Sequence, residues 1–185
     1  MASFPDAGET GAQLFERADY ALYFAKDSRR GAAVIFSSEH ETQIRRINEV
    51  EQALRRSDLS SEMYLAFQPI VDAESNRVVS FEALARWVSP SLGHIAPVDF
   101  IRVAERSGLI HELTEILLRK SLDAAKDWPV DMRISFNLSA LDLTSPTALE
   151  RIADITRSSG VEPERIDFEI TRPLSSPTTS RPEPP

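Results

Sequence analysis

Hydrophobic and polar positions alternate along residues 78–87, and this alternation predicts a β-strand with two different faces. One face is apolar and carries Phe81, Ala83, Ala85 and Trp87. The opposite face carries Glu82, Leu84 and Arg86. A strand with an acidic and a basic side chain on one face either holds a charged ligand or lies at the edge of a sheet with a solvated face.

Strand and helix patterns alternate through the rest of the chain after residue 62. Strands are predicted at 63–71, 77–87, 132–138 and 165–170, and helices at 97–106, 110–127 and 146–158. Ser145 and Pro146 suit the start of the last helix, and Gly160 ends it. This order predicts a parallel α/β sheet or barrel. A short polar turn at 72–76 joins the first two strands, so we expect that pair to be antiparallel.

The first part of the chain predicts a helix at 12–27, a short buried strand at 32–36 and a second helix at 39–57. The first helix and the strand are together too small to fold alone, so we interpret them as the end of a domain. In the second helix Ile47, Val50 and Leu54 have heptad-like spacing. That helix is either a signalling connector or dimer helix, or an amphipathic helix that lies on a domain.

Composition narrows the classes of function. The chain has 185 residues and a net charge of −8, which argues against non-specific binding to DNA or to anionic membranes. It has no cysteine, which excludes disulfides and thiolate metal sites. No secretory signal and no membrane-length apolar run are present, so we expect a cytoplasmic setting. Residues 172–185 are rich in Pro, Ser and Thr and are expected to be a disordered tail.

Three oxygen-bearing side chains share an orientation. In a barrel with outer helices, Glu82, Asn137 and Glu169 point into the lumen, and the last two lie at the C-terminal ends of their strands. Two carboxylates and an amide oxygen suit Mg²⁺ or Mn²⁺. Simpler interpretations also exist for these side chains and for Arg86. Glu169 is then a surface residue, Asn137 a turn residue and Arg86 an ion-pair partner of Glu82.

Several motifs occur in a recognisable order. They are Phe67-Gln68-Pro69-Ile70-Val71, the stretch from Phe81 to Trp87, Pro97 with Phe100-Ile101, Ala104-Glu105, Gly108-Leu109-Ile110, Asn137-Leu138-Ser139 and Phe168-Glu169-Ile170-Thr171. Over about residues 45–171 the chain resembles the EAL domain, a family that hydrolyses the bacterial second messenger cyclic-di-GMP. Residues 11–38 resemble the end of a GGDEF (diguanylate cyclase) domain, without its signature loop.

The resemblance implies a role for individual residues. Glu82, Asn137 and Glu169 are implied metal ligands for Mg²⁺ or Mn²⁺, and Gln68, Leu84 and Arg86 are implied contacts to the dinucleotide. Arg86 would bind a phosphate, which its planar guanidinium suits. In the family the metals activate a water that attacks a phosphodiester, and the product is pGpG.

The chain departs from the family in its second half. A complete barrel needs about 250 residues, whereas four strands are predicted here, so we expect an incomplete TIM-like barrel. The family's paired aspartates, catalytic lysine and later acidic ligands cannot be located, and Arg172 stands where the family usually has a second Glu. We therefore expect no phosphodiesterase activity from this chain alone, and self-association through the open barrel edge or through helix 39–57.

The resulting organisation is a GGDEF remnant at 1–38, a linker helix at 39–58, the N-terminal half of an EAL domain at 59–171 and a tail at 172–185. Three interpretations of function stay open. The chain is a fragment of a cyclic-di-GMP signalling protein of the EAL phosphodiesterase type, or a degenerate EAL module that binds the nucleotide or a protein partner without catalysis. In the third, it is a broken gene product whose tail is translated from a shifted frame.

Overall fold

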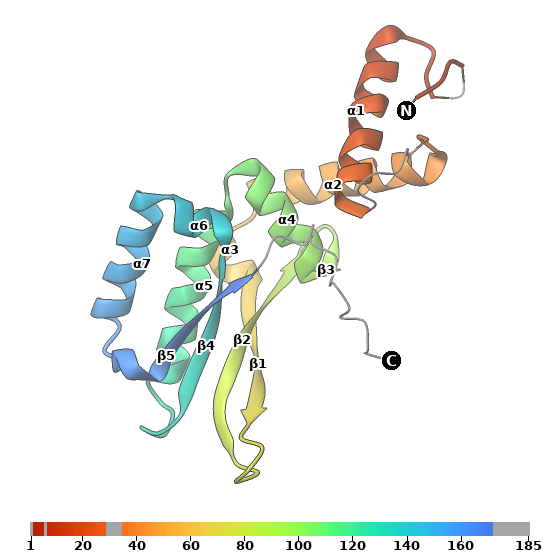
Figure 1. The fold of residues 1–185 in the computed structure, drawn as a ribbon. Helices are drawn as coiled ribbons and strands as arrows, with labels where there is room; N and C mark the ends of the chain where they lie inside the picture. The colour runs from red at the N-terminus through yellow and green to blue at the C-terminus, as the bar shows by residue number, and fades with distance from the viewer. Residues whose placement is uncertain (1, 6, 29–34, 172–185) are drawn as a thin grey trace, which may run out of the picture. The chain divides into compact units, whose positions relative to one another are not determined.

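The structure is a computed structural model that describes residues 2–5, 7–28 and 35–171 (Figure 1). The described residues fall into two compact units. One contains the residues up to Asn48, and the other spans Glu49–Thr171. None of the described helices is long and apolar enough to cross a membrane.

The first unit contains α1 (Gly11–Ser28) and the first half of α2 (Ser38–Arg56). Both predicted helices are thus confirmed to within one residue at each end. Thr10 starts α1: its hydroxyl accepts the backbone N–H of Gln13 at 3.3 Å, and the Gln13 side chain accepts the N–H of Thr10 at 3.3 Å. Arg17 joins the two helices through an ion pair with Glu41 at 2.8 Å.

The structure describes only the last two residues of the strand predicted at 32–36. Residues 32–34 lie outside the described residues, and so does the tail at 172–185. The described part, Ile35 and Phe36, belongs to no strand. Ile35 is 62% exposed, so the apolar run does not correspond to burial at this position.

Two of the three heptad-like positions of α2, Val50 and Leu54, have a simpler role than dimerisation. Val50 and Leu54 are 1% and 2% exposed, and both belong to the second unit. Side chains buried within one chain cannot form an exposed seam for a partner helix. The structure therefore favours an amphipathic helix that lies on a domain.

The second unit is a mixed α/β structure. Its elements are α3 (Leu59–Glu62), β1 (Met63–Val71), β2 (Val78–Ser89), β3 (Gly93–Ile95), α4 (Pro97–Ser107), α5 (Ile110–Ala125), β4 (Arg133–Ser139), α6 (Ala140–Thr144), α7 (Pro146–Ser158), the 3₁₀ turn η1 (Pro163–Arg165) and β5 (Ile166–Thr171). The strands lie in the order β1-β2-β4-β5, and β3 pairs with β2. The pairs β2–β4 and β4–β5 are parallel, and β1–β2 is antiparallel. The four predicted strands and the antiparallel first pair are confirmed; β3, α3, α6 and η1 were not predicted.

The helices cover the apolar face of this sheet (Figure 1). Their buried side chains include Leu113, Leu118 and Leu122 of α5. Trp87 of β2 packs edge-on against Phe100 of α4, with ring centroids 5.8 Å apart. The core therefore lies between the sheet and the helix layer, and no described helix of the second unit covers the other sheet face.

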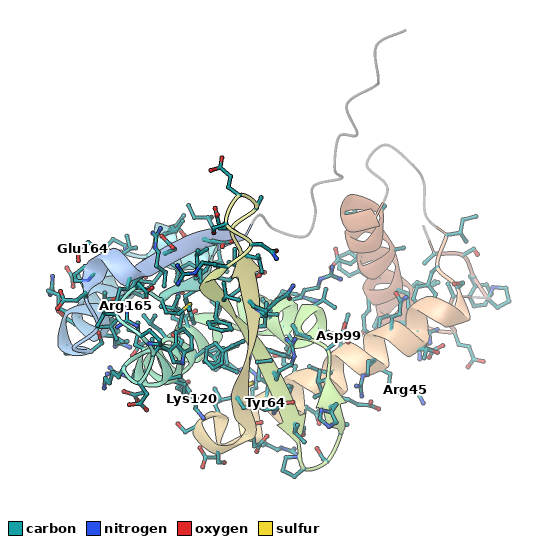
Figure 2. All side chains as sticks on the ribbon, turned by 90° about the horizontal axis from the view of Figure 1, so that it is seen from below. Arg45, Tyr64, Asp99, Lys120, Glu164 and Arg165 are labelled. Carbon is teal, nitrogen blue, oxygen red and sulfur yellow. The ribbon has the colours of Figure 1, made fainter. Side chains whose placement is uncertain are left out.

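Two basic side chains, Lys120 and Arg165, form hydrogen bonds with backbone carbonyls at the ends of these elements (Figure 2). Lys120 of α5 donates to the backbone carbonyls of Ser60 at 2.6 Å and Met63 at 2.8 Å, where α3 meets β1. Arg165 donates to the carbonyls of Ala125 and Met132, both at 2.9 Å. Carbonyls at element ends lack partners within the element, so these bonds fix the positions of β1 and β5 against α5.

Candidate functional site

The sheet face opposite the helices carries every residue that the sequence singled out for a site. Register pairs Gln68 with Glu82, and Asn137 with Glu169. Directly paired residues project from the same face of a sheet, and residues two apart on one strand share that face. Leu84 and Arg86 follow Glu82 at that interval on β2. The predicted common orientation is therefore present.

Asn137 and Glu82 are in direct contact. The Asn137 amide Nδ2 donates to Glu82 Oε1 at 2.7 Å, between β4 and β2. The donor side of the amide is used in this bond, which leaves its oxygen available as an acceptor. Asn137 is thus a residue of the sheet face that bonds across strands, and not a turn residue.

Glu169 lies on the other side of Asn137, on β5. Its Oε1 accepts a hydrogen bond from the hydroxyl of Ser135, which is 1% exposed. Ser135 pairs in register with Glu82, so one buried hydroxyl lies between the two carboxylate-bearing strands. The alternation of β4 placed Ser135 on this face, but nothing in the sequence indicated which carboxylate it would bind.

The oxygen atoms of these side chains are of the type that binds hard divalent cations. Glu82, Asn137 and Glu169 offer carboxylate and amide oxygens, the ligands preferred by Mg²⁺ and Mn²⁺. Among the residues that the structure describes, no group of three or more His, Cys, Asp or Glu side chains could hold a metal ion. The face therefore supplies part of a coordination shell, and the remaining ligands would be water, substrate or further protein oxygens.

Arg86 makes no ion pair with Glu82. Its Nη1 donates to the backbone carbonyl of Ala85 at 2.8 Å, while Glu82 bonds to Asn137. The simpler interpretation, in which Arg86 serves only to neutralise Glu82, is wrong. Among the described residues its guanidinium has no carboxylate partner, so its charge is available to an anion on this face.

A buried polar network fixes the end of β4 just after the site. The Ser139 hydroxyl donates to Glu105 Oε1 at 2.6 Å, and the fully buried Asp142 Oδ2 accepts from Thr114 Oγ1 at 2.8 Å. Asp142 Oδ1 lies 2.7 Å from His111 Nδ1. These bonds connect β4 to α4, α5 and α6, and no sequence motif pointed to them.

A cavity of about 170 Å³ is bounded by β1, β2, β4, α4 and α5, and Leu84, Arg86 and Asn137 are among the residues that line it. Its walls are mainly apolar and include Ala83, Leu113 and Phe136 from β2, α5 and β4. A charged dinucleotide would lose its hydration against these mainly apolar walls and would gain few polar partners there. The polar sheet face is therefore the better candidate for a phosphate-bearing ligand.

Comparison with known proteins identifies the second unit. The EAL domain family matches residues 47–182. An uncharacterized signaling protein of Caulobacter vibrioides is 38% identical over 171 residues, which are 92% of this chain and 21% of that protein. The bifunctional diguanylate cyclase/cyclic di-GMP phosphodiesterase MucR of Pseudomonas aeruginosa is 31% identical, over 92% of this chain and 26% of that protein.

A solved structure supports the same fold. The PaMucR phosphodiesterase in complex with c-di-GMP superposes with a TM-score of 0.61 at 27% identity, over 69% of this chain and 53% of that chain. The chain thus spans about a quarter of the length of these curated relatives and about half of the solved chain.

Proposed function

Because the chain belongs to the EAL domain family, we propose that its polar sheet face is one side of a cyclic-di-GMP site of the EAL phosphodiesterase type. The observation that carries the proposal is the grouping of Glu82, Asn137 and Glu169 on one face, with Glu82 and Asn137 bonded at 2.7 Å. The PaMucR phosphodiesterase is bound to c-di-GMP in its solved structure, and its fold is similar.

Each site residue has a distinct part in this proposal. Arg86 binds a phosphate of the ligand, because its guanidinium offers paired donors and has no acidic partner among the described residues. Gln68 and Leu84 contact the nucleoside portions from β1 and β2. These residues hold and orient the phosphodiester on the sheet face, so that it lies beside the two carboxylates.

The oxygen atoms of this residue set are of the kind that a divalent cation, Mg²⁺ or Mn²⁺, takes as ligands. Glu82, Asn137 and Glu169 would hold it, and when bound it would supply an activated water for attack on phosphorus. Asn137 presents its oxygen because Glu82 occupies its nitrogen. Ser135 restrains Glu169 through the hydroxyl hydrogen bond, which keeps that carboxylate on the ligand face.

Binding without hydrolysis is the second candidate function. The observation that favours it is the absence, within the described residues, of any cluster of three or more acidic or histidine side chains that could hold a metal. Hydrolysis through two metals requires a fuller set of ligands than two carboxylates and one amide. We propose that this chain alone binds the dinucleotide and does not convert it to pGpG.

The N-terminal part fits a cyclase remnant. The relative named for both cyclase and phosphodiesterase activity matches over 92% of this chain, whereas the EAL family matches from residue 47. We therefore propose that residues 1–38 end a GGDEF domain, that residues 39–58 are a linker helix and that the EAL half-domain covers residues 59–171.

Two measurements on the full chain test the proposal. Calorimetric titration with cyclic-di-GMP should show binding, and Arg86→Ala should weaken it about 10- to 100-fold, because a charge-assisted phosphate contact is lost. Arg157→Ala, which removes a charge from an exposed ion pair on α7, is the matched control and should change nothing. Absence of binding by the unchanged chain, or equal binding by Arg86→Ala, would contradict the proposed site.

The second measurement is chemical. Purified chain incubated with cyclic-di-GMP and Mg²⁺ or Mn²⁺ should yield no pGpG by chromatography. Formation of pGpG by this chain, and its loss in Glu82→Ala, would overturn the proposal of binding without hydrolysis. The proposed position of the binding site would not be affected by that result.

A further inference from the structure

We propose that Tyr64 is a base-stacking residue of this site, which takes one guanine ring of the dinucleotide beside the phosphate bound by Arg86. The inference rests on the proposed function and extends it. It names the residue that would let the site select a nucleotide over other phosphate-bearing ligands.

The position of Tyr64 follows from the strand register. Tyr64 of β1 pairs with Arg86 of β2 in the antiparallel ladder. Residues directly opposite each other in such a ladder share a face, with Cβ atoms about 4.5–5.5 Å apart. The next pair on this face is Ala66 with Leu84, and after it comes Gln68 with Glu82. Tyr64 therefore begins a row of residues that the proposed ligand would cover.

The preceding residue fixes which way the ring faces. Met63 is completely buried on the helix side, so the alternation of β1 directs Tyr64 to the opposite face. Tyr64 is 43% exposed, and β1 is an edge strand in the described sheet. In the part of the chain that the structure describes, its hydroxyl has no hydrogen-bond partner. The ring is thus attached to an ordered strand and is partly exposed to solvent.

The chemistry of the ligand matches this pair of side chains. A cyclic dinucleotide carries two flat purine bases and two phosphates in one compact ring. Arg86 can bind a phosphate of any compound, so by itself it does not select a nucleotide. An aromatic ring next to it gives a π surface for a base, and removing such a stack weakens binding about 5- to 150-fold.

Calorimetric titration of the full chain with cyclic-di-GMP tests the assignment. Tyr64→Phe keeps the ring and should bind within about twofold of the unchanged chain. Tyr64→Ala should bind about 5- to 150-fold more weakly, and Tyr64→Leu should also bind weakly because an aliphatic side chain does not stack. Ile70→Ala is the matched control: Ile70 lies on the same face of β1, is 38% exposed and should have no effect.

The outcomes separate this inference from the function on which it rests. Binding by the unchanged chain together with equal binding by Tyr64→Ala overturns the role of Tyr64 alone. Loss in Tyr64→Phe equal to the loss in Tyr64→Ala also overturns it, because the hydroxyl and not the ring would then carry the contact. No binding by the unchanged chain overturns both proposals. A thermal melt of each variant by circular dichroism checks that the exposed substitution leaves the fold intact.

Discussion

Asp142 shows how one buried charge can organise several elements. Its carboxylate has no solvent exposure and accepts from Thr114 Oγ1 at 2.8 Å and from the Ser139 N–H at 3.2 Å. A buried carboxylate is tolerated only when its oxygens are bonded in this way. Removal of the carboxylate would leave its partners without an acceptor.

We therefore expect Asp142→Ala to lower the free energy of unfolding by about 2–5 kcal/mol, measured by urea denaturation. Asp154→Ala is the control, since Asp154 forms an exposed ion pair with Arg157 and should change stability by less than about 0.5 kcal/mol. Equal stabilities of the two variants would show that the buried network does not hold the end of β4.

Asp72 lies in the turn between β1 and β2, and its pKa is lowered. The Ser75 hydroxyl bonds its Oδ1 at 2.6 Å, and this side-chain bond together with the Ser75 N–H holds the pKa of Asp72 below its ordinary value of 3.8. Because the folded pKa is lowered, the stabilisation from this carboxylate is present above pH 3.8 and is lost as the pH falls through the folded pKa.

Ser75→Ala should raise the pKa of Asp72 toward 3.8 without reaching it, because the Ser75 N–H bond remains at 2.8 Å. Carboxyl ¹³C NMR titration measures this directly. Ser158→Ala removes a hydroxyl that bonds only helix carbonyls, so it should leave the Asp72 titration unchanged. An unmoved Asp72 pKa in Ser75→Ala would contradict the assigned cause.

At the scale of elements, Lys120 ties α5 to the junction of α3 and β1 through the carbonyls of Ser60 and Met63. Lys120→Met keeps the apolar stem and removes both bonds, so we expect a loss of about 1–3 kcal/mol in the free energy of unfolding. Chemical denaturation of Lys126→Met gives the comparison, because Lys126 makes an exposed ion pair with Asp123. An equally small loss of unfolding free energy in both variants would show that the two Lys120 hydrogen bonds do not stabilise the fold.

The sequence predicted elements well where periodicity was long. The alternation of apolar and polar residues along β2 and β4 predicted both strands and the face that carries Glu82 and Asn137. The three-residue strand β3 is too short to show such an alternation. The predicted burial is wrong at Ile35, which is exposed in the structure, while residues 32–34 of that run lie outside the described residues.

Partnerships between elements were harder to predict than the elements. Ser135 bonds Glu169 from 34 residues away, and Thr114 bonds Asp142 from 28 residues away. Such pairs depend on strand order and helix packing, which no local pattern encodes. A local contact of Asp142 does have a sequence signature: the Ser139-x-x-Asp142 spacing is that of a capping box, and the structure contains one at α6.

At the scale of the whole molecule, the described sheet is open, with β1 and β5 as its edges. In β5 the apolar face is poorly covered, since Phe168 is 39% and Ile170 is 61% exposed. An edge strand with exposed apolar side chains and free backbone groups pairs readily with another chain. This arrangement supports the proposed self-association through the barrel edge over association through α2, whose Val50 and Leu54 are buried.

Ile170→Lys should therefore shift the purified chain toward monomer, because a charged side chain on an edge strand opposes pairing with a second copy. Sedimentation velocity at several micromolar concentrations of both proteins measures the change. Val130→Lys supplies the control, since Val130 is 87% exposed in the loop between α5 and β4 and lies on no sheet edge. If the unchanged chain sediments as a monomer at all concentrations, or if both variants dissociate the assembly equally, the β5 edge is not the surface that associates.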